Sequence, residues 1–163
     1  MFRELLSVAL IIMSLASCRA DTAAAQETVT AAETQTAADN AEETKETMLG
    51  LAINGTPVSV EWEDNESVNA LRKLAAEEPI VIQMSMYGGF EQVGSLGKSI
   101  ARNDVQTTAS AGDIVLYSGS NIVIFYGSNS WAYTRLGHIT GKTAGELSEL
   151  LGNGDVTITI SVI

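Results

Sequence analysis

Short apolar runs alternate with polar breaks along the chain from residue 48 to its end. The runs are rich in Val, Ile and Tyr, and the breaks consist mainly of Gly, Asn and Asp. Runs of this kind separated by turn-forming residues are typical of β-strands. We therefore predict a mainly β domain over residues 48–163.

Seven of the apolar runs are predicted to be strands. They are Leu49–Ile53, Val58–Trp62, Pro79–Tyr87, Asp113–Tyr117, Asn121–Gly127, Trp131–Ile139 and Asp155–Ile163. Asn54 and Gly55 provide the turn of a hairpin between the first two runs. The sequence SGS joins the strands that begin at Asp113 and Asn121 in a second hairpin.

One amphipathic helix is predicted between the second and third strands. Asp64 or Asn65 can cap its N-terminus, and Pro79 prevents it from continuing. Its apolar stripe consists of Val68, Leu71, Leu74 and Ala75. This spacing places the four side chains on one face, which we expect to cover the sheet.

A second, short helix is predicted near the C-terminus. Thr143 and Glu146 have the spacing of a capping box, and the helix should end near Gly152. Roughly eight strands with two helices favour a closed barrel with helices over its ends, because closure removes exposed strand edges. The predicted fold is therefore mainly β, a closed eight-stranded β-barrel with two short helices.

The segment Gly88–Gly112 is predicted to be a long, glycine-punctuated loop. Loops of this length in compact domains often carry function. Arg102 could reach from this loop into a groove, although the Asn103 and Asp104 that follow it are also ordinary turn residues. We expect Glu91 and Lys98 to be solvated charges.

The N-terminal residues resemble a lipoprotein signal peptide over residues 1–17. Arg3 gives a basic start, and Leu5–Leu15 is an apolar run too short to cross a bilayer. The sequence LASC, Leu15–Cys18, resembles the bacterial lipobox, in which the cysteine is acylated after cleavage. Cys18 is the only cysteine of the chain, so it has no disulfide partner. We predict that Cys18 anchors the protein by lipid, outside the cytoplasm in the bacterial cell envelope.

Residues 18–47 are predicted to form a disordered acidic tether. They consist largely of Ala, Thr, Gln and Glu and lack the apolar surface needed to offset chain entropy. The whole chain has a formal net charge of −11. Without a basic patch, binding to nucleic acid is disfavoured, and an anionic membrane should repel the tether. Lipid is therefore the only membrane contact that we expect.

The composition also limits the chemistry of the domain. His138 is the only histidine, and no second cysteine exists to complete a metal site. We therefore expect no metal and no cofactor. A hydrolase would have to use His138 as its base, and no Gly-x-Ser-x-Gly motif accompanies it. His138 is more typical of a strand end than of a catalytic site.

Aromatic residues are the strongest candidates for a binding surface. By strand alternation, Trp131, Tyr133 and Arg135 share one face. Aromatic residues with an arginine are enriched at binding surfaces, but a guanidinium stacked on a ring also stabilises a barrel exterior. Both interpretations remain open. The candidate ligand-binding residues are Tyr87, Phe90, Arg102, Trp131, Tyr133 and Arg135.

Several motifs together resemble the bacterial cyclophilin-like fold family. They are GSLG (94–97), ARND (101–104), AGDIVLYSGSNIVIFYGSNSW (111–131), YTRLGHI (133–139) and the terminal LGNGDVTITISV. The resemblance covers residues 49–163. It implies a cyclophilin-type barrel of eight strands and two helices, in an exported lipoprotein with a low-complexity tether.

The resemblance leaves the activity open, because a fold does not specify a function. Cyclophilins isomerise the peptide bond before proline, with an arginine that stabilises the twisted amide. If LGHI matches their Phe-Gly-Lys-Val segment, Tyr133 takes the place of their histidine and His138 that of their lysine. Their arginine motif, followed by Phe-Met-x-Gln-Gly-Gly, is missing, although Arg102 or Arg135 could substitute.

We therefore predict a membrane-anchored binding module for a peptide or small-molecule ligand. The alternative is a divergent peptidyl-prolyl cis-trans isomerase, and a structural lipoprotein of the envelope is a third possibility. The ligand and the oligomeric state are left open by the sequence.

Overall fold

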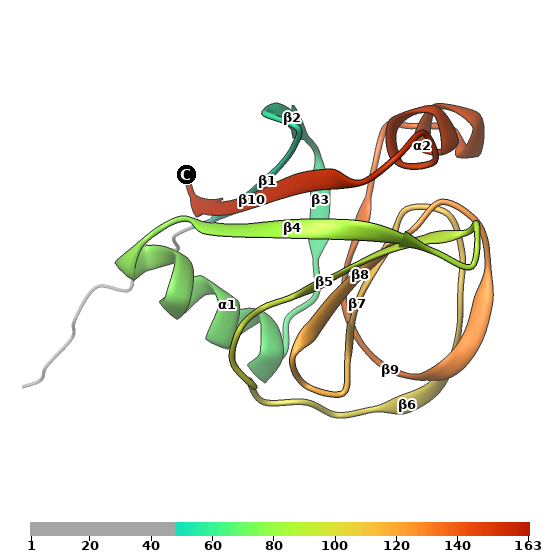
Figure 1. The fold of residues 1–163 in the computed structure, drawn as a ribbon. Helices are drawn as coiled ribbons and strands as arrows, with labels where there is room; N and C mark the ends of the chain where they lie inside the picture. The colour runs from blue at the N-terminus through green and yellow to red at the C-terminus, as the bar shows by residue number, and fades with distance from the viewer. Residues whose placement is uncertain (1–47) are drawn as a thin grey trace, which may run out of the picture. The chain divides into compact units, whose positions relative to one another are not determined.

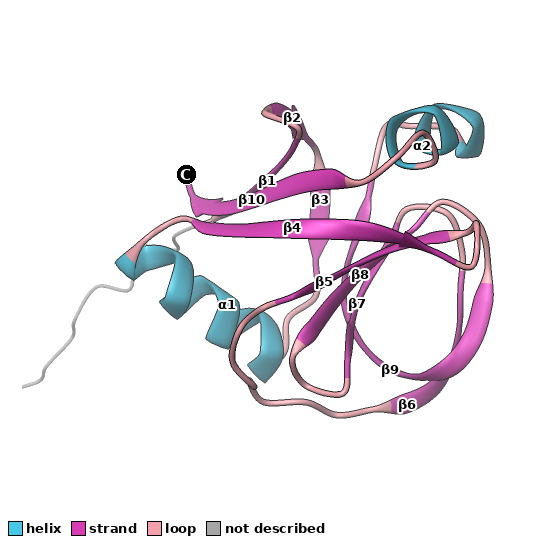
Figure 2. Ribbon diagram, in the orientation of Figure 1, coloured by secondary structure: helices cyan, strands magenta, loops and turns pink. Residues whose placement is uncertain are grey.

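The computed structural model describes residues 48–163. The predicted signal peptide, Cys18 and the tether lie outside the described residues. Ten strands and two helices are present within residues 48–163 (Figures 1 and 2). The strands are β1 (Leu49–Ile53), β2 (Thr56–Val58), β3 (Val60–Trp62), β4 (Ile80–Tyr87), β5 (Glu91–Ser95), β6 (Val105–Ala109), β7 (Asp113–Tyr117), β8 (Asn121–Phe125), β9 (Asn129–Ile139) and β10 (Val156–Val162). The helices are α1 (Glu66–Glu77) and α2 (Ala144–Leu151). In this part of the chain, neither helix is long and apolar enough to cross a membrane.

The strands form one antiparallel sheet that curls into a nearly closed barrel. Its order is β2-β1-β10-β4-β5-β8-β7-β9-β3, and β6 pairs with β9 beside this path. The two end strands, β2 and β3, are separated in the chain by Ser59 alone. Across this seam the indole N–H of Trp62 donates a hydrogen bond to the carbonyl of Leu49 at 2.8 Å. The expectation of a mainly β barrel with two helices is confirmed.

The first hairpin follows the predicted turn but not the predicted second strand. Asn54 and Gly55 both have positive φ, as a two-residue hairpin turn requires, and Ile53 faces Thr56 across it. The run Val58–Trp62, predicted as one strand, is divided between two. Its first residue ends β2, while Val60–Trp62 forms β3 and pairs with β9. This division brings the two edges of the sheet together.

The first helix forms where the apolar stripe predicted it. Asn65 is the N-cap, and its side chain accepts a hydrogen bond from the backbone N–H of Val68. Val68, Leu71 and Ala75 are buried against the sheet. The helix ends before Pro79, as expected.

The second helix has the predicted capping box. The Thr143 hydroxyl accepts from the N–H of Glu146, and the Glu146 carboxylate accepts from the N–H of Thr143. The backbone N–H and the hydroxyl of Thr143 both donate to the Glu146 carboxylate, and these two bonds lower the pKa of Glu146. Gln92 of β5 fastens the other end of the helix, because its amide donates to the carbonyls of Leu151 and Gly154 at 2.6 and 2.7 Å. Figure 1 shows α1 and α2 on opposite sides of the barrel.

Alternating residues of β7 and β8 build two separate apolar clusters, one on each face of the sheet. Interior positions such as Leu116 and Ile124 belong to the main core, which also receives the buried faces of both helices. On the outer face, a small cluster consists of Ala109, Val115, Val123, Phe125 and Tyr133, with Phe90 and Val93 packed against it. We call this set the outer cluster.

The prediction of one long loop over Gly88–Gly112 is wrong, because the segment contains β5 and β6. The β5 sequence EQVGS has only one large apolar residue, so it lacks the pattern of a strand. Its polar residues are explained by their surroundings: Gln92 holds α2, and Gly94 lies where a Cβ would be 2.5 Å from Ile82 and from the Met84 sulfur. The close approach of β4 thus requires glycine at this position.

Candidate functional site

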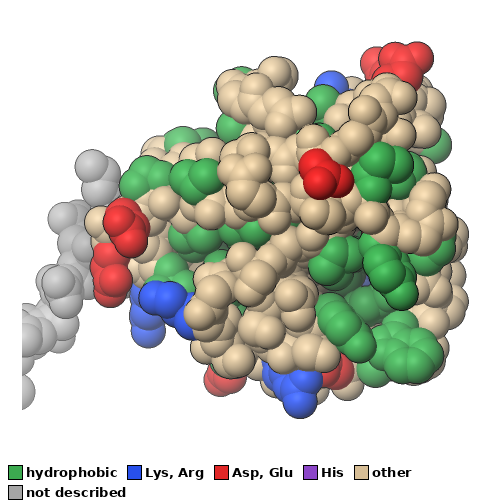
Figure 3. All heavy atoms as spheres, in the orientation of Figure 1, with side chains coloured by type: hydrophobic (Ala, Val, Ile, Leu, Met, Phe, Trp, Pro, Cys, Tyr) green, Lys and Arg blue, Asp and Glu red, His purple; other side chains and the backbone are tan. Residues whose placement is uncertain are grey.

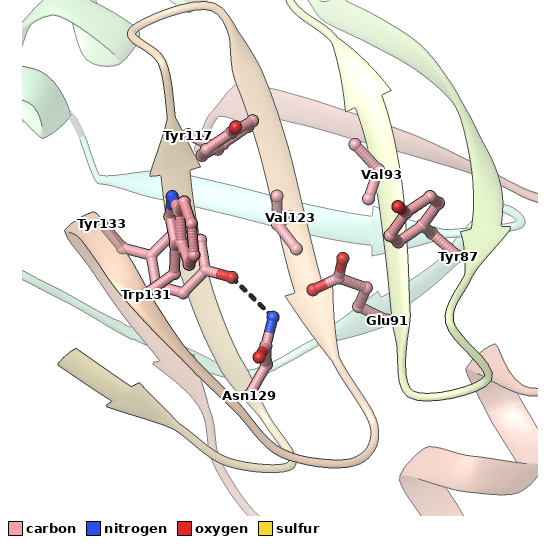
Figure 4. Close-up of a pocket in the computed structure, with 8 residues that line it drawn as sticks. All are labelled: Tyr87, Glu91, Val93, Tyr117, Val123, Asn129, Trp131 and Tyr133. Atoms are coloured by element: carbon pink, nitrogen blue, oxygen red, sulfur yellow. Dashed lines mark hydrogen bonds between the residues drawn. The ribbon is translucent and has the colours of Figure 1, made fainter. Parts of the chain in front are cut away.

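An aromatic cavity opens on the outer face of the sheet, above the outer cluster. Its volume is about 270 Å³. It is lined by Tyr87, Glu91, Val93, Tyr117, Val123, Asn129, Trp131 and Tyr133 (Figure 4). We call it the aromatic pocket. In the space-filling view, hydrophobic side chains gather at the right of the molecule, where β5, β8 and β9 lie (Figure 3).

The β4–β5 turn places an aromatic ring beside an acid. Gly88 and Gly89 both have positive φ, and the tight turn that they form sets Tyr87 directly opposite Glu91. Directly opposite residues of an antiparallel pair point to the same face. Tyr87 and Glu91 therefore both reach the aromatic pocket, Tyr87 at its mouth with 67% of its surface exposed.

The other side of the pocket is built by the N-terminal half of β9. Figure 4 shows Trp131 and Tyr133 facing Glu91 across Val123 of β8. The Tyr133 ring is held by edge-to-face contacts with Phe125 and Tyr117, at centroid distances of 5.7 and 6.2 Å. Trp131, by contrast, is 57% exposed. One wall is thus fixed by packing, and the mouth is formed by accessible rings.

A hydrogen-bond chain orients the phenol of Tyr133. The backbone N–H of Ser130 donates to Oδ1 of Asn129, so the amide group of Asn129 must donate through Nδ2. Its acceptor is the Tyr133 hydroxyl, at 3.1 Å. Burial raises the pKa of Tyr133, the negative charge of Glu91 raises it further, and the Asn129 bond acts in the opposite direction. The hydroxyl of Tyr133 therefore stays protonated and can donate a hydrogen bond to a ligand.

Glu91 is the one charged residue in the lining of this pocket. It is only 6% exposed, and its Oε2 is buried without a hydrogen-bond partner among the described residues. Burial raises the pKa of Glu91 above its ordinary value of 4.5. The expectation that Glu91 is a solvated charge is therefore wrong. Its side chain lies on the outer face of β5, but it is buried there in the lining of the aromatic pocket.

A second cavity adjoins the first and contains both candidate arginines. Its lining includes Arg102, Arg135, Asn103 and Tyr133, and the last of these also lines the aromatic pocket. Arg102 forms an ion pair with Asp104 at 3.0 Å. The other oxygen of Asp104 accepts from the hydroxyl of a buried threonine of β9. Arg102 is thus paired within its own loop while it lines the second cavity.

Arg135 and His138 converge on a buried carboxylate. The Asp113 side chain lies 3.4 Å from the Arg135 guanidinium and 2.9 Å from Nδ1 of His138. Its other oxygen accepts from the backbone N–H of Ser110. Burial acts to raise the pKa of Asp113, but the bonds to Ser110 and His138 and the charge of Arg135 lower it on balance. His138 thus contacts a carboxylate that Ser110 and Arg135 also engage, and it lines neither cavity.

The candidate residues predicted from the sequence divide between three places. Tyr87, Trp131 and Tyr133 meet in the aromatic pocket, and Arg102 and Arg135 lie in the adjoining cavity. Phe90 lines neither cavity and packs against the outer cluster.

The remaining pocket residues are absent from the predicted set: Glu91, Val93, Tyr117, Val123 and Asn129. Residues 91–95 were assigned to a loop, and without a strand there the alternation of Glu91 and Val93 carries no information. For Tyr117, the signal lay in its position at the end of a recognised strand, two residues after the outward-facing Val115.

Comparison with known proteins agrees with this architecture. A search of curated proteins gives no match. A family model described as the cyclophilin-like family matches residues 51–161, which include every strand from β2 to β9 and both helices. With well over half of the chain matched, and with the barrel and its two helices in place, the chain belongs to the cyclophilin-like family.

Proposed function

We propose that this protein is a lipid-anchored binding module of the bacterial cell envelope that holds a peptide or small ligand in the aromatic pocket. The anchor would be the acylated Cys18, and residues 18–47 would carry the domain away from the membrane. The pocket would bind the ligand without a covalent step.

The observation that carries this proposal is the convergence of four aromatic residues on one cavity. Tyr87, Tyr117, Trp131 and Tyr133 come from three strands that are distant in the sequence. Two of these rings are more than half exposed, although burying them would be more stabilising. Clusters of exposed aromatic rings around a concavity are typical of binding sites.

The pocket also offers complementary polar groups. The Tyr133 hydroxyl can donate a hydrogen bond to the ligand, and the Glu91 carboxyl oxygen can accept one. A peptide group carries one acceptor and one donor, and both could be paired within this cavity. A few placed polar groups on an otherwise apolar lining give a ligand its orientation.

The two tryptophans provide a direct test. Trp62 is fixed in the barrel seam, and Trp131 lies at the mouth of the pocket. In an NMR titration of the full chain with peptide pools, we expect the indole signal of Trp131 to move while that of Trp62 stays. A Trp131→Phe variant assigns the two signals. Pools that leave the Trp131 signal and the pocket amides in place would contradict the proposal.

Two further measurements complete the test. A Cys18→Ser variant should move from the membrane fraction to the soluble fraction of the cell envelope, and unchanged fractionation would exclude the lipid anchor.

Proline-containing peptides in the NMR titration also report isomerase activity. Exchange between cis and trans forms that is faster than in the free peptide would replace a binding-only function by catalysis.

A further inference from the structure

We infer that the aromatic pocket selects a cationic side chain, lysine or arginine, of a polypeptide ligand, and that Glu91 is the residue that recognises it. This inference rests on the proposed binding function and specifies the chemistry of its ligand. It follows from the burial of the Glu91 carboxyl group, from the rings around it and from the shape of the surface.

The Glu91 carboxyl group is buried and has an unused acceptor. Its Oε2 has no hydrogen-bond partner in residues 48–163, and none of the residues lining the pocket is Lys, Arg or His. A buried carboxylate without a partner is costly for a folded protein, whereas a cation with N–H groups would supply both charge and hydrogen bonds. A neutral ligand would satisfy only the hydrogen bond.

The aromatic rings favour the same occupant. Tyr87, Trp131 and Tyr133 surround the space in front of Glu91 (Figure 4). The faces of such rings attract an ammonium or guanidinium group, and their apolar edges pack against its methylene chain. The described residues also carry more acidic than basic groups, twelve against six, so the surrounding field is attractive to cations.

The dimensions point to a side chain that belongs to a longer ligand. A cavity of about 270 Å³ has room for one long side chain and lies at the lower limit of the pockets that enclose whole drug-sized molecules, roughly 300 Å³. The surface continues from this cavity past Tyr133 into the second one, beside the exposed Val105 of β6. A polypeptide can place one cationic side chain at Glu91 and extend along this surface.

The test compares short peptides that differ at one central residue. Isothermal titration of the full chain uses capped alanine peptides with Lys, Arg or norleucine at the centre, because norleucine has the length of lysine without its nitrogen. We expect the Lys and Arg peptides to bind about tenfold more tightly than the norleucine peptide, as for a hydrogen bond to a charged group. Norleucine binding within about twofold of lysine would overturn the inference.

Glu91→Gln is the critical variant, since it keeps the shape of the side chain and removes its charge. We expect it to reduce the preference for Lys over norleucine to about twofold. Glu149→Gln on α2 makes the same change of charge at an exposed position and should keep the full preference. Thermal unfolding confirms that both variants are folded. A preference that survives in Glu91→Gln would remove Glu91 from the recognition.

A pH series gives a readout that a purely structural role would not produce. The titratable groups that line the pocket with Glu91 are the phenols of Tyr87 on β4, Tyr117 on β7 and Tyr133 on β9. Lysine binding should weaken as acid protonates Glu91, and this dependence should be absent in Glu91→Gln. An equal dependence in both proteins would contradict the inference.

The outcomes separate this inference from the proposed function. If the norleucine peptide binds as well as the Lys peptide and Trp131→Ala abolishes both, the pocket is a binding site but not a cation site. If none of these peptides binds but the peptide pools still move the Trp131 signal, the cation inference fails and the proposed binding function stands. If n-butylammonium alone binds as tightly as the Lys peptide, the pocket takes free amines, and the polypeptide ligand is excluded.

Discussion

Two carboxyl groups are almost equally buried in this barrel, but their surroundings are opposite. Asp113 at the start of β7 is 4% exposed, and Glu91 at the start of β5 is 6% exposed. Asp113 accepts from Ser110, lies beside Arg135 and contacts His138. Glu91 has only neutral neighbours in the aromatic pocket. The pKa of Asp113 is lowered, and that of Glu91 is raised.

The difference separates a structural acid from one that lacks a partner. The Asp113 carboxylate accepts a hydrogen bond in a turn and forms an ion pair that fastens β7 to β9. Its charge is therefore compensated by groups of the protein itself. No basic residue among those that line the pocket compensates the charge of Glu91. Buried polar groups are normally satisfied, and the unsatisfied oxygen of Glu91 beside a cavity is the feature from which we infer a partner outside the chain.

The largest effect is expected from Asp113→Asn. The substitution keeps the shape of the side chain but removes a buried charge, and we expect it to lower the free energy of unfolding by about 2 kcal/mol at pH 7. The value is at the low end for charged hydrogen bonds because Arg135 and His138 are partly exposed and screened by solvent. Urea unfolding of both proteins measures it.

The pH dependence of this loss follows from the lowered pKa of Asp113. The stabilisation is present above the ordinary value of 3.8 and disappears as the pH falls through the folded-state pKa. The wild type and Asp113→Asn should therefore converge in strong acid. Equal stability of the two proteins at pH 7 would show that the carboxylate does not hold the strands together.

Glu91→Gln should have a smaller effect of opposite sign. Without a ligand, the variant should be more stable than the wild type by about 1 kcal/mol at neutral pH, because it no longer buries an unpartnered charge. Since the pKa of Glu91 is raised, its contribution is most favourable below 4.5 and is lost as the pH rises through the folded-state pKa. The two proteins should therefore converge below pH 4.5 and diverge above it.

Urea unfolding across this pH range measures the effect, and Glu149→Gln serves as the control for a change in net charge. A Glu91→Gln variant that is less stable at pH 7 would contradict the comparison. Near pH 4 the two buried acids can be told apart: the stabilisation by the Asp113 carboxylate is still present there, while the destabilisation by the charge of Glu91 has vanished.

The sequence predicted the barrel well because its main signals are local. The hairpin turn at Asn54 and Gly55, the cap at Asn65 and the capping box at Thr143 depend on neighbouring residues only, and all three are present. Three aromatic members of the pocket were found because aromatic residues are conspicuous in any sequence. Strand alternation then placed two of them, Trp131 and Tyr133, on one face.

The rest of the site depends on contacts that the sequence does not display. Glu91 becomes a buried acid only because β5, polar in composition, is paired on both sides by β4 and β8. On β9 the register shifts between the residues paired with Ile114 and Val115 of β7, so that Leu136 faces no residue of β7. Arg135 and His138 therefore come to the same face of the sheet. Simple alternation would place these two residues on opposite faces.

His138→Ala should have the smallest effect on stability. His138 lies 2.9 Å from Asp113 but is 45% exposed, and pairs of this kind contribute little, so we expect a loss of about 0.5 kcal/mol. Because His138 lines neither cavity, affinity for the Lys peptide should stay within about twofold of the wild type. Isothermal titration and urea unfolding measure the two quantities. A large loss of affinity without a loss of stability would give the histidine a role in binding and would end the separation between a structural and a functional carboxylate.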